Sequence, residues 1–308
     1  MLHVASYMLH DLVRQFLEHL EIERNLSQLT IRNYDHYLSR FLEFVAKNFP
    51  AVSSPDQLSE NIIRQYRLFL SRFTDEHKLP LKKVTQGYHI IALRSFLKYL
   101  TKRQIKTIPS EMLDIPKGES RSLKFLDKEQ MERLLKSPAN IRDKAVLELL
   151  FSTGLRVSEL VGLNKDDVNL ERKEFSVIGK GGRIRVVFIS ESAAYWIRKY
   201  LEERKKDIKD SDKALFIRVS GRRDAPLRLT ARSIQRLVEK YVKKAGLSIK
   251  ITPHGIRHSF ATDLLNAGAD LRAIQEMLGH KSVATTQIYT HLTNPQLRKV
   301  HERFHRRK

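Results

Sequence analysis

Cysteine is absent from the 308 residues of this chain, which excludes disulfide bonds, a cysteine nucleophile and any zinc site built with cysteine. Uninterrupted apolar runs long enough to span a bilayer are also absent. The first sixteen residues, MLHVASYMLHDLVRQF, lack the basic start and small-residue cleavage site of a signal peptide, and are typical of an amphipathic helix. We therefore expect a cytoplasmic protein without a membrane segment.

Acidic residues are the third deficit. The chain has 35 Asp and Glu against 57 Lys and Arg, which gives a formal net charge of +22. A basic excess of this size favours a polyanionic partner, and nucleic acid is a stronger expectation than an acidic membrane. A ribosome-associated or salt-adapted protein remains the alternative.

The N-terminal third has a helical pattern. A chain of this length, with 41% apolar residues, predicts two domains, the first over residues 1–110. The segment HDLVRQFLEHLEIE (10–23) places Leu12, Phe16, Leu17 and Leu20 on one helix face, and Ser27 or Thr30 would cap the next helix. Basic and aromatic residues that interleave on these helices are either solvated and core side chains or a DNA-facing surface: Arg32, Tyr34, Arg64, Tyr66, Arg94 and Lys98.

The segment TIPSEMLDIPKGESRS (107–122) follows, with two prolines, a glycine and several serines, and predicts a linker at 111–122. The second domain, 123–308, restarts with a helix capped by Asp127, and Gly154 should end the next one. Residues 174–189, EFSVIGKGGRIRVVFI, predict a hairpin with Lys180 at or near its tip. The predicted fold class is mainly α with a small antiparallel β-sheet.

The stretch HGIRH, 254–258, allows two interpretations. Thr252 and Pro253 should open a helix that presents His254 and Arg257 on one face of its positive end, which suits a phosphate. A metal would instead use His254 and His258, and by residue type His280 and His291 could be further ligands. The catalytic carboxylate of an H-E-x-x-H motif is replaced by Gly255, and Arg257 repels a dication. The phosphate interpretation is favoured, so neither a metal nor another cofactor is expected.

Four segments together carry a resemblance. TGLRVSEL (153–160), GKGGRIRVV (179–187), TPHGIRHSFAT (252–262) and LGHKSVATTQIYTH (278–291) each resemble a signature of the tyrosine recombinase (phage integrase) family, in the family's order. The Xer-type members are most similar. The catalytic resemblance covers about residues 120–292, and the N-terminal part resembles the family's core-binding domain less specifically. This implies a two-domain architecture, a helical core-binding domain and an α+β catalytic domain, that clamps duplex DNA.

The resemblance also implies a catalytic set of six residues: Arg156, Lys180, His254, Arg257, His280 and Tyr289. The two arginines would bind the phosphate oxygens, because the guanidinium fork matches phosphate geometry. Tyr289 would be the nucleophile that forms a 3′-phosphotyrosine link to DNA. Neither a metal nor ATP is needed, since arginine and lysine supply the charge and the covalent link retains the bond energy.

The remaining three residues have supporting roles by the same resemblance. His254 would handle or orient the proton of the tyrosine, Lys180 would protonate the leaving 5′-oxygen, and His280 would brace the phosphate. Glu159, three residues after Arg156, could hold its guanidinium. Arg183 stands where many relatives have lysine, which leaves open which side chain at the hairpin tip reaches the scissile bond.

Each of these residues alone has a simpler structural interpretation, and only their joint occurrence favours catalysis. Tyr289 alone could be a packed core tyrosine, and Tyr195 and Tyr200 are rivals that do not follow the Gly-His signature. In the tail, Leu297, Val300 and Phe304 could form an apolar helix face that packs on a neighbouring protomer, as family members do. The alternative is a basic tail that touches the DNA backbone.

The implied function is site-specific recombination of double-stranded DNA, by a tetramer on two sites or with a paired paralogue, and with a possible regulatory protein. Chromosome dimer resolution and mobile-element integration or excision both remain open, as does the DNA target. A type IB topoisomerase activity and a catalytically silent DNA-binding protein are the alternatives. An enzyme of this kind would be associated with the nucleoid.

Overall fold

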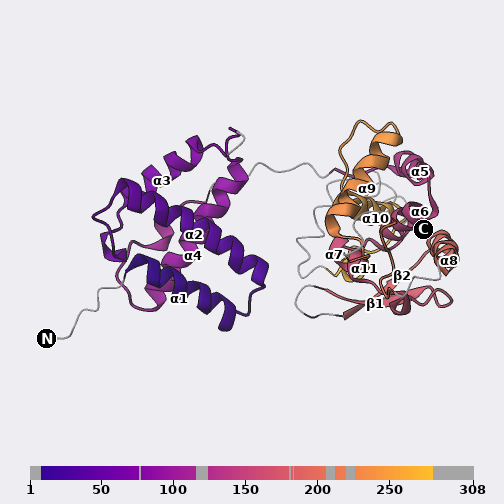
Figure 1. Ribbon diagram of the computed structural model, residues 1–308, viewed down its shortest axis with the longest axis horizontal. Coiled ribbons are helices and arrows are strands. Elements are labelled where there is room, and N and C mark those ends of the chain that lie inside the picture. The colour runs from indigo at the N-terminus through magenta and orange to yellow at the C-terminus, as the bar shows by residue number, and fades with distance from the viewer. Residues whose placement is uncertain are drawn as a thin grey trace, which may run out of the picture. The chain divides into compact units, whose positions relative to one another are not determined.

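The computed structural model describes residues 8–75, 78–115, 124–179, 182, 184–205, 212–219 and 226–279. The chain divides into two compact units, Met1–Arg121 and Ser122–Lys308. Figure 1 shows that helices dominate both units, and each unit has a hydrophobic core of its own. In the part of the chain that the structure describes, no helix is both long and apolar enough to cross a membrane.

Four α-helices build the described part of the first unit (Figure 1): α1 (Leu9–Ile22), α2 (Gln28–Asn48), α3 (Glu60–Arg72) and α4 (Lys83–Lys102), with short 3-10 turns η1 (Pro55–Gln57) and η2 (Ser110–Met112). Ser27 begins α2, because its side chain accepts a hydrogen bond from the backbone N–H of Thr30. Of the two caps that the sequence allows, the structure therefore uses Ser27.

The apolar face predicted for α1 is confirmed. Leu12, Phe16 and Leu20 are buried, while Leu17 is half-buried at the edge of the same core. The ring of Phe16 lies 5.6 Å from that of Phe96 on α4 and 5.3 Å from that of Tyr99. These aromatic contacts join the first and last helices of the unit, and each buried ring of this kind contributes about 2 kcal/mol or more.

A cluster of polar side chains surrounds His89 on α4, inside the first unit. Its Nδ1 lies 3.2 Å from the hydroxyl of Tyr66, and its Nε2 lies 3.2 Å from Nη1 of Arg40. Burial, followed by the positive charge of Arg40, lowers the pKa of His89 to about 4. The imidazole is therefore neutral at pH 7, and Tyr66 belongs to the core rather than to a DNA-facing surface.

The predicted linker at 111–122 begins inside the first unit. Leu113 is buried in its core, next to η2, which packs on α4. Residues 116–123 lie outside the described residues, so the position of the linker and the limits of the two domains stay predictions.

The second unit has seven described α-helices and one hairpin (Figure 1): α5 (Lys128–Lys136), α6 (Ile141–Thr153), α7 (Val157–Gly162), β1 (Glu174–Ile178), β2 (Ile184–Phe188), α8 (Glu191–Lys205), α9 (Ala231–Lys244), α10 (Pro253–Asn266) and α11 (Leu271–Leu278), with a 3-10 turn η3 (Lys165–Asp167). Helix α6 is buried on most sides and packs on both α8 and α10. As predicted, Asp127 caps α5 and Gly154, with φ of +58°, ends α6.

The predicted hairpin is confirmed over the described residues. Strands β1 and β2 pair antiparallel, with Val177 opposite Arg185 and Phe175 opposite Val187. Phe175, Val177 and Val187 face the core of the unit. The hairpin residues Lys180, Gly181 and Arg183 lie outside the described residues, so the question of which cation reaches the scissile bond stays open. Strand β2 also packs beside α11, which brings the hairpin next to the last described helix.

Candidate functional site

The first cation of the candidate site, Arg156, begins helix α7. Its backbone N–H and its Nη1 donate to the two carboxylate oxygens of Glu159, at 2.8 and 2.9 Å, which closes the first turn of the helix. Glu159 thus holds the guanidinium as the sequence suggests. The Arg156 side chain remains 33% exposed, so a ligand at the surface can still reach it.

Burial alone would raise the pKa of Glu159, but hydrogen bonds and positive charges from Arg185 and Arg156 outweigh it and lower the pKa to about 2. The carboxylate is therefore ionised at every pH at which the protein would work. Arg185, on β2, donates to it at 2.7 and 3.0 Å. Sequence reasoning did not single out Arg185.

Helix α10 carries the second cation and a histidine, and it starts as predicted. The Thr252 side chain accepts from the backbone N–H of Gly255, and Pro253 occupies the first turn. A side chain at Gly255 would place its Cβ 3.1 Å from the carbonyl oxygen of Lys124. The glycine in HGIRH thus lets the start of the second unit lie against the helix, which accounts for a residue that a metalloprotease motif would fill with glutamate.

Arg257 is buried, with only 2% of its surface exposed. Its Nη1 donates to the carbonyl of Gly154 at 2.6 Å and its Nη2 to that of Leu278 at 2.5 Å. Gly154 is two residues before Arg156, and Leu278 is two residues before His280. Arg257 therefore joins the segments of chain that lead to two other candidate catalytic residues.

His254 lies at the exposed start of α10. Partial burial, followed by the charges of Arg257 and Arg156, lowers its pKa from the usual value. The imidazole is therefore neutral at pH 7, and its unprotonated ring nitrogen is free to accept a proton. The same arrangement thus brings a proton acceptor near two cations.

His258, the second histidine of HGIRH, is buried, and its ring centroid lies 4.3 Å from that of His254. Burial, followed by His254 and Arg257, lowers its pKa to about 4. Within the described residues no group of three histidine and carboxylate side chains is placed to hold a metal. The two rings pack edge to face, with an interplanar angle of 72°. His280 and His291, the further ligands of the metal interpretation, lie outside the described residues, so that interpretation is not tested.

Three of the six candidate residues, Arg156, His254 and Arg257, fall within the described residues, and the structure brings them together at the starts of α7 and α10. The other three, Lys180, His280 and Tyr289, lie outside the described residues, as do Leu297, Val300 and Phe304 of the tail. Of the rival tyrosines, Tyr200 is buried against Phe216, whereas Tyr195 is 47% exposed.

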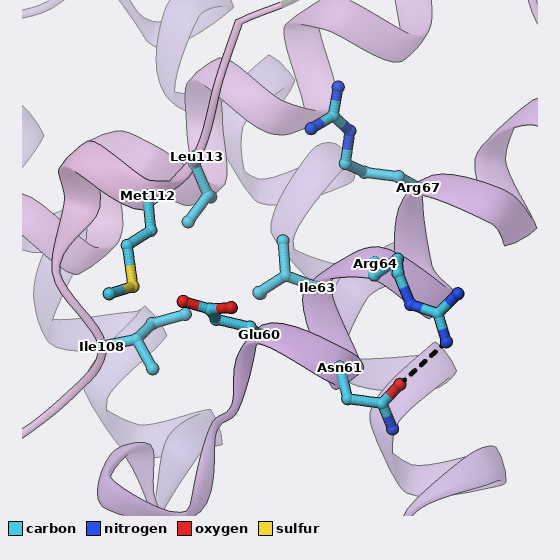
Figure 2. A pocket seen from close by; sticks show the side chains of 8 residues that line it. All are labelled: Glu60, Asn61, Ile63, Arg64, Arg67, Ile108, Met112 and Leu113. Carbon is cyan, nitrogen blue, oxygen red and sulfur yellow. Dashed lines mark hydrogen bonds between the residues drawn. The ribbon is translucent and has the colours of Figure 1, made fainter.

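A pocket of about 650 Å³ lies in the first unit, between α3 and residues 108–113. Figure 2 shows Arg64, which donates a hydrogen bond to Asn61, on one side of the pocket, and Ile108 and Met112 on the other. None of its lining residues belongs to the candidate catalytic set. The candidate site instead consists of cations and a histidine at helix starts, which suits the backbone of an extended polymer.

Comparisons with known proteins cover nearly the whole chain. A family model described as "Phage integrase family" matches residues 124–295, and one described as "Phage integrase, N-terminal SAM-like domain" matches residues 13–104. The chain is 38% identical to a protein named Tyrosine recombinase XerC from Actinobacillus succinogenes, over 97% of this chain and 98% of the relative. It is 36% identical to Tyrosine recombinase XerD from Oceanobacillus iheyensis, over 97% of this chain and 100% of the relative.

Solved structures of recombinases are also similar to this chain over most of its length. The XerA recombinase has 32% identity and a TM-score of 0.53, with 97% of this chain and 99% of that chain covered. The XerH site-specific recombinase bound to its palindromic difH substrate in a post-cleavage complex has 25% identity and a TM-score of 0.70, with 94% and 82% covered.

Proposed function

Because the chain belongs to the phage integrase family of tyrosine recombinases, we propose that it is an Xer-type site-specific recombinase that cuts and rejoins double-stranded DNA. The observation that carries this proposal is the end-to-end match to tyrosine recombinases at 36–38% identity. The grouping of Arg156, His254 and Arg257 at adjoining helix starts supports it, because these are family motif positions.

The proposed reaction transfers a DNA phosphate from the 5′-oxygen of the next nucleotide to the phenol oxygen of Tyr289. The phenol oxygen of Tyr289 attacks phosphorus and gives its proton to neutral His254, and a 3′-phosphotyrosine bond forms. The bond to the 5′-oxygen breaks, and Lys180 protonates that oxygen so that it leaves as a hydroxyl. An incoming 5′-hydroxyl reverses these steps on a new strand.

The arginines stabilise the extra negative charge of the transition state, and each such contact contributes about 3 kcal/mol. Arg156 is exposed enough to contact a phosphate directly. Arg257 is almost wholly buried, so its proposed phosphate contact uses a small exposed edge or follows a movement of its neighbours. His280 completes the set by bracing the phosphate.

The proposed partner is duplex DNA, in keeping with the net charge of +22. Recombination of two sites uses four protomers, either of this chain alone or with a paired paralogue, and passes through a Holliday junction. Packing of the C-terminal tail on a neighbouring protomer, a regulatory protein and association with the nucleoid belong to the same proposal.

The test is a covalent-trapping assay. Duplexes that bind the protein are selected from random sequences, and a nick is placed beside the cut so that the short released strand diffuses away. The wild type should form a site-specific covalent adduct, and Tyr289→Phe should bind the same DNA without forming it. If the wild type forms no covalent adduct on the selected site, the proposed recombinase activity is refuted.

Two further outcomes of this assay separate related activities. Plasmid relaxation without site preference would favour a topoisomerase. A chelator should leave adduct formation unchanged. If the chelator instead inhibits adduct formation, the metal interpretation of HGIRH is favoured again.

A further inference from the structure

Arg185 is a charged residue on the core-facing side of β2. It alternates with buried Val187 and lies opposite Val177, and its side chain is 9% exposed. A charge in such a place costs several kcal/mol unless it is paired and hydrogen-bonded. Its contacts should therefore explain why it is there.

The guanidinium of Arg185 forms a two-pronged pair with Glu159: Nη1 donates to Oε1 at 3.0 Å and Nη2 to Oε2 at 2.7 Å. The same two oxygens accept from Nη1 and the backbone N–H of Arg156. One carboxylate thus serves two arginines, and one of them belongs to the proposed catalytic set.

The remaining edge of the guanidinium reaches α11. Nε of Arg185 donates to the carbonyl of Met277 at 3.0 Å. The next two carbonyls along the chain, of Leu278 and Gly279, accept from Arg257 and Arg156. Three arginines from three different elements thus hold successive carbonyls at the end of α11, immediately before His280. These are carbonyls that a helix leaves without partners inside itself.

Gly279 shows how tightly Arg185 fits there. A Cβ at position 279 would lie 3.1 Å from Cδ of Arg185, and the residue has φ of +63°. The backbone before His280 therefore lies directly against the Arg185 side chain.

We propose that Arg185 is a positioning residue for strand cleavage, which acts through Glu159 on Arg156 and through Met277 on the segment that precedes His280. This inference rests on the proposed function. Arg185 is five residues after Lys180, the proposed general acid, on the same hairpin. Its contacts therefore also connect strand β2 to the segments that hold Arg156 and Arg257. Its fork points to Glu159 and its Nε to Met277, so its role is not to bind DNA.

Charge gives Arg185 a second effect. Glu159 with Arg156 alone would be a neutral pair, which attracts a phosphate weakly. With Arg185 the three side chains carry a net charge of +1, and Arg156 keeps its pull on the phosphate. Loss of Arg185 should therefore slow cleavage through charge as well as through geometry.

The test compares Arg185→Met, Arg185→Lys and a matched control, Arg204→Met. Arg204 is also buried and donates to backbone carbonyls, those of Ala214 and Leu215, but not to Glu159. Three quantities are measured on the full chain: the thermal midpoint, the affinity for the selected duplex, and the single-turnover rate of adduct formation at saturating DNA.

Arg185→Met should slow adduct formation about tenfold or more, while DNA affinity changes less than about threefold, because misplacement of a reacting group is costly. Arg185→Lys keeps the charge and should recover part of the rate. Arg204→Met should lower the thermal midpoint without slowing the chemistry. A rate for Arg185→Met that equals the wild type, or that matches Arg204→Met at equal stability, would overturn the inference.

A second comparison, of adduct-formation rates with Glu159→Gln, distinguishes action through Glu159 from a purely structural role of Arg185. If Arg185 acts through Glu159, the double variant with Arg185→Met should be no slower than the slower single variant. Multiplied losses would overturn the inference, and this comparison can use Arg185→Lys if Arg185→Met does not fold. A wild type that forms no adduct would instead refute the proposed function, and the inference would fall with it.

Discussion

The core of the first unit is built around aromatic rings, with Phe16, Phe41 and Phe96 fully buried, whereas the second unit encloses ions among its aliphatic side chains. Asp143, Glu148, Arg204 and Arg257 are all buried there, while the buried polar side chains described in the first unit are His89 and Ser110. Both units are helical, so the contrast lies in what their cores contain rather than in their architecture.

The difference has a physical reason. Buried ions add little net stability and often reduce it. They do hold chain segments in fixed relation, and Arg185, Arg204 and Arg257 each donate to backbone carbonyls. A site that must aim several cations at one phosphate needs such fixed segments. The first unit contributes no residue to the proposed catalytic set, and its core is held by ring packing.

The largest expected effect comes from Arg257→Lys. Lysine cannot donate to the carbonyls of Gly154 and Leu278 and also present a planar fork to phosphate, so adduct formation should slow by about a hundredfold or more. The matched change in the first unit is Arg40→Lys, which alters a contact with His89 and should leave the rate at saturating DNA within about threefold. Equal losses in single-turnover assays would erase the contrast between the units.

Gly154→Ala should be the largest stability change, a loss of about 3 kcal/mol. The residue has φ of +58°, and a Cβ would lie 2.4 Å from Cδ1 of Phe260. The only tryptophan of the chain, Trp196, is in the second unit, so urea unfolding followed by its fluorescence measures this loss. An unchanged midpoint would show that α6 and α10 are packed less tightly than described.

Acid should weaken both units in the same pH range. Burial lowers the pKa of His89 and of His258 to about 4, so the unfolded chain, with histidine near 6.5, binds more protons. The stability from each is fully present above pH 6.5 and is lost as pH falls towards 4. Between pH 7.5 and 5.5 we expect a loss of about 1 kcal/mol for each, after allowance for solvent screening.

Tryptophan fluorescence and circular dichroism, followed in parallel, measure this loss for the second unit and for the whole chain. His89→Asn should flatten the pH dependence of the first unit alone. A flattened tryptophan transition in that variant would contradict the assignment of one titrating histidine to each core.

The smallest effect has the opposite sign. Gly87 lies within α4, where a Cβ would meet nothing within 4 Å. Gly87→Ala should therefore stabilise the first unit by about 0.5–1 kcal/mol, because alanine loses less backbone freedom in a helix. A lower midpoint by circular dichroism would show that α4 is crowded at this point.

Local features of the fold could be predicted from the sequence. The caps at Ser27, Asp127 and Thr252 and the end of α6 at Gly154 depend on a few neighbouring residues, and the structure confirms them. The hairpin follows in the same way from β-prone runs on either side of glycines. Membership of the tyrosine recombinase family, inferred from four ordered segments, is confirmed by the full-length relatives.

Contacts between distant segments could not be predicted. Arg257 was expected to face a phosphate, and nothing in HGIRH indicates that its fork reaches Gly154, 103 positions earlier. Arg185 did leave a signal in IRVVFI, where it alternates with Val187 and Ile189 on the buried face of a strand. A charge at such a position requires a partner, but the sequence does not say that the partner is Glu159.

Tyr289 is the proposed nucleophile, and mass spectrometry of the trapped adduct tests its link to DNA most directly. After nuclease and protease digestion, we expect a nucleotide joined through its 3′-phosphate to the peptide that contains Tyr289. A link to exposed Tyr195, or through a 5′-phosphate, would contradict it.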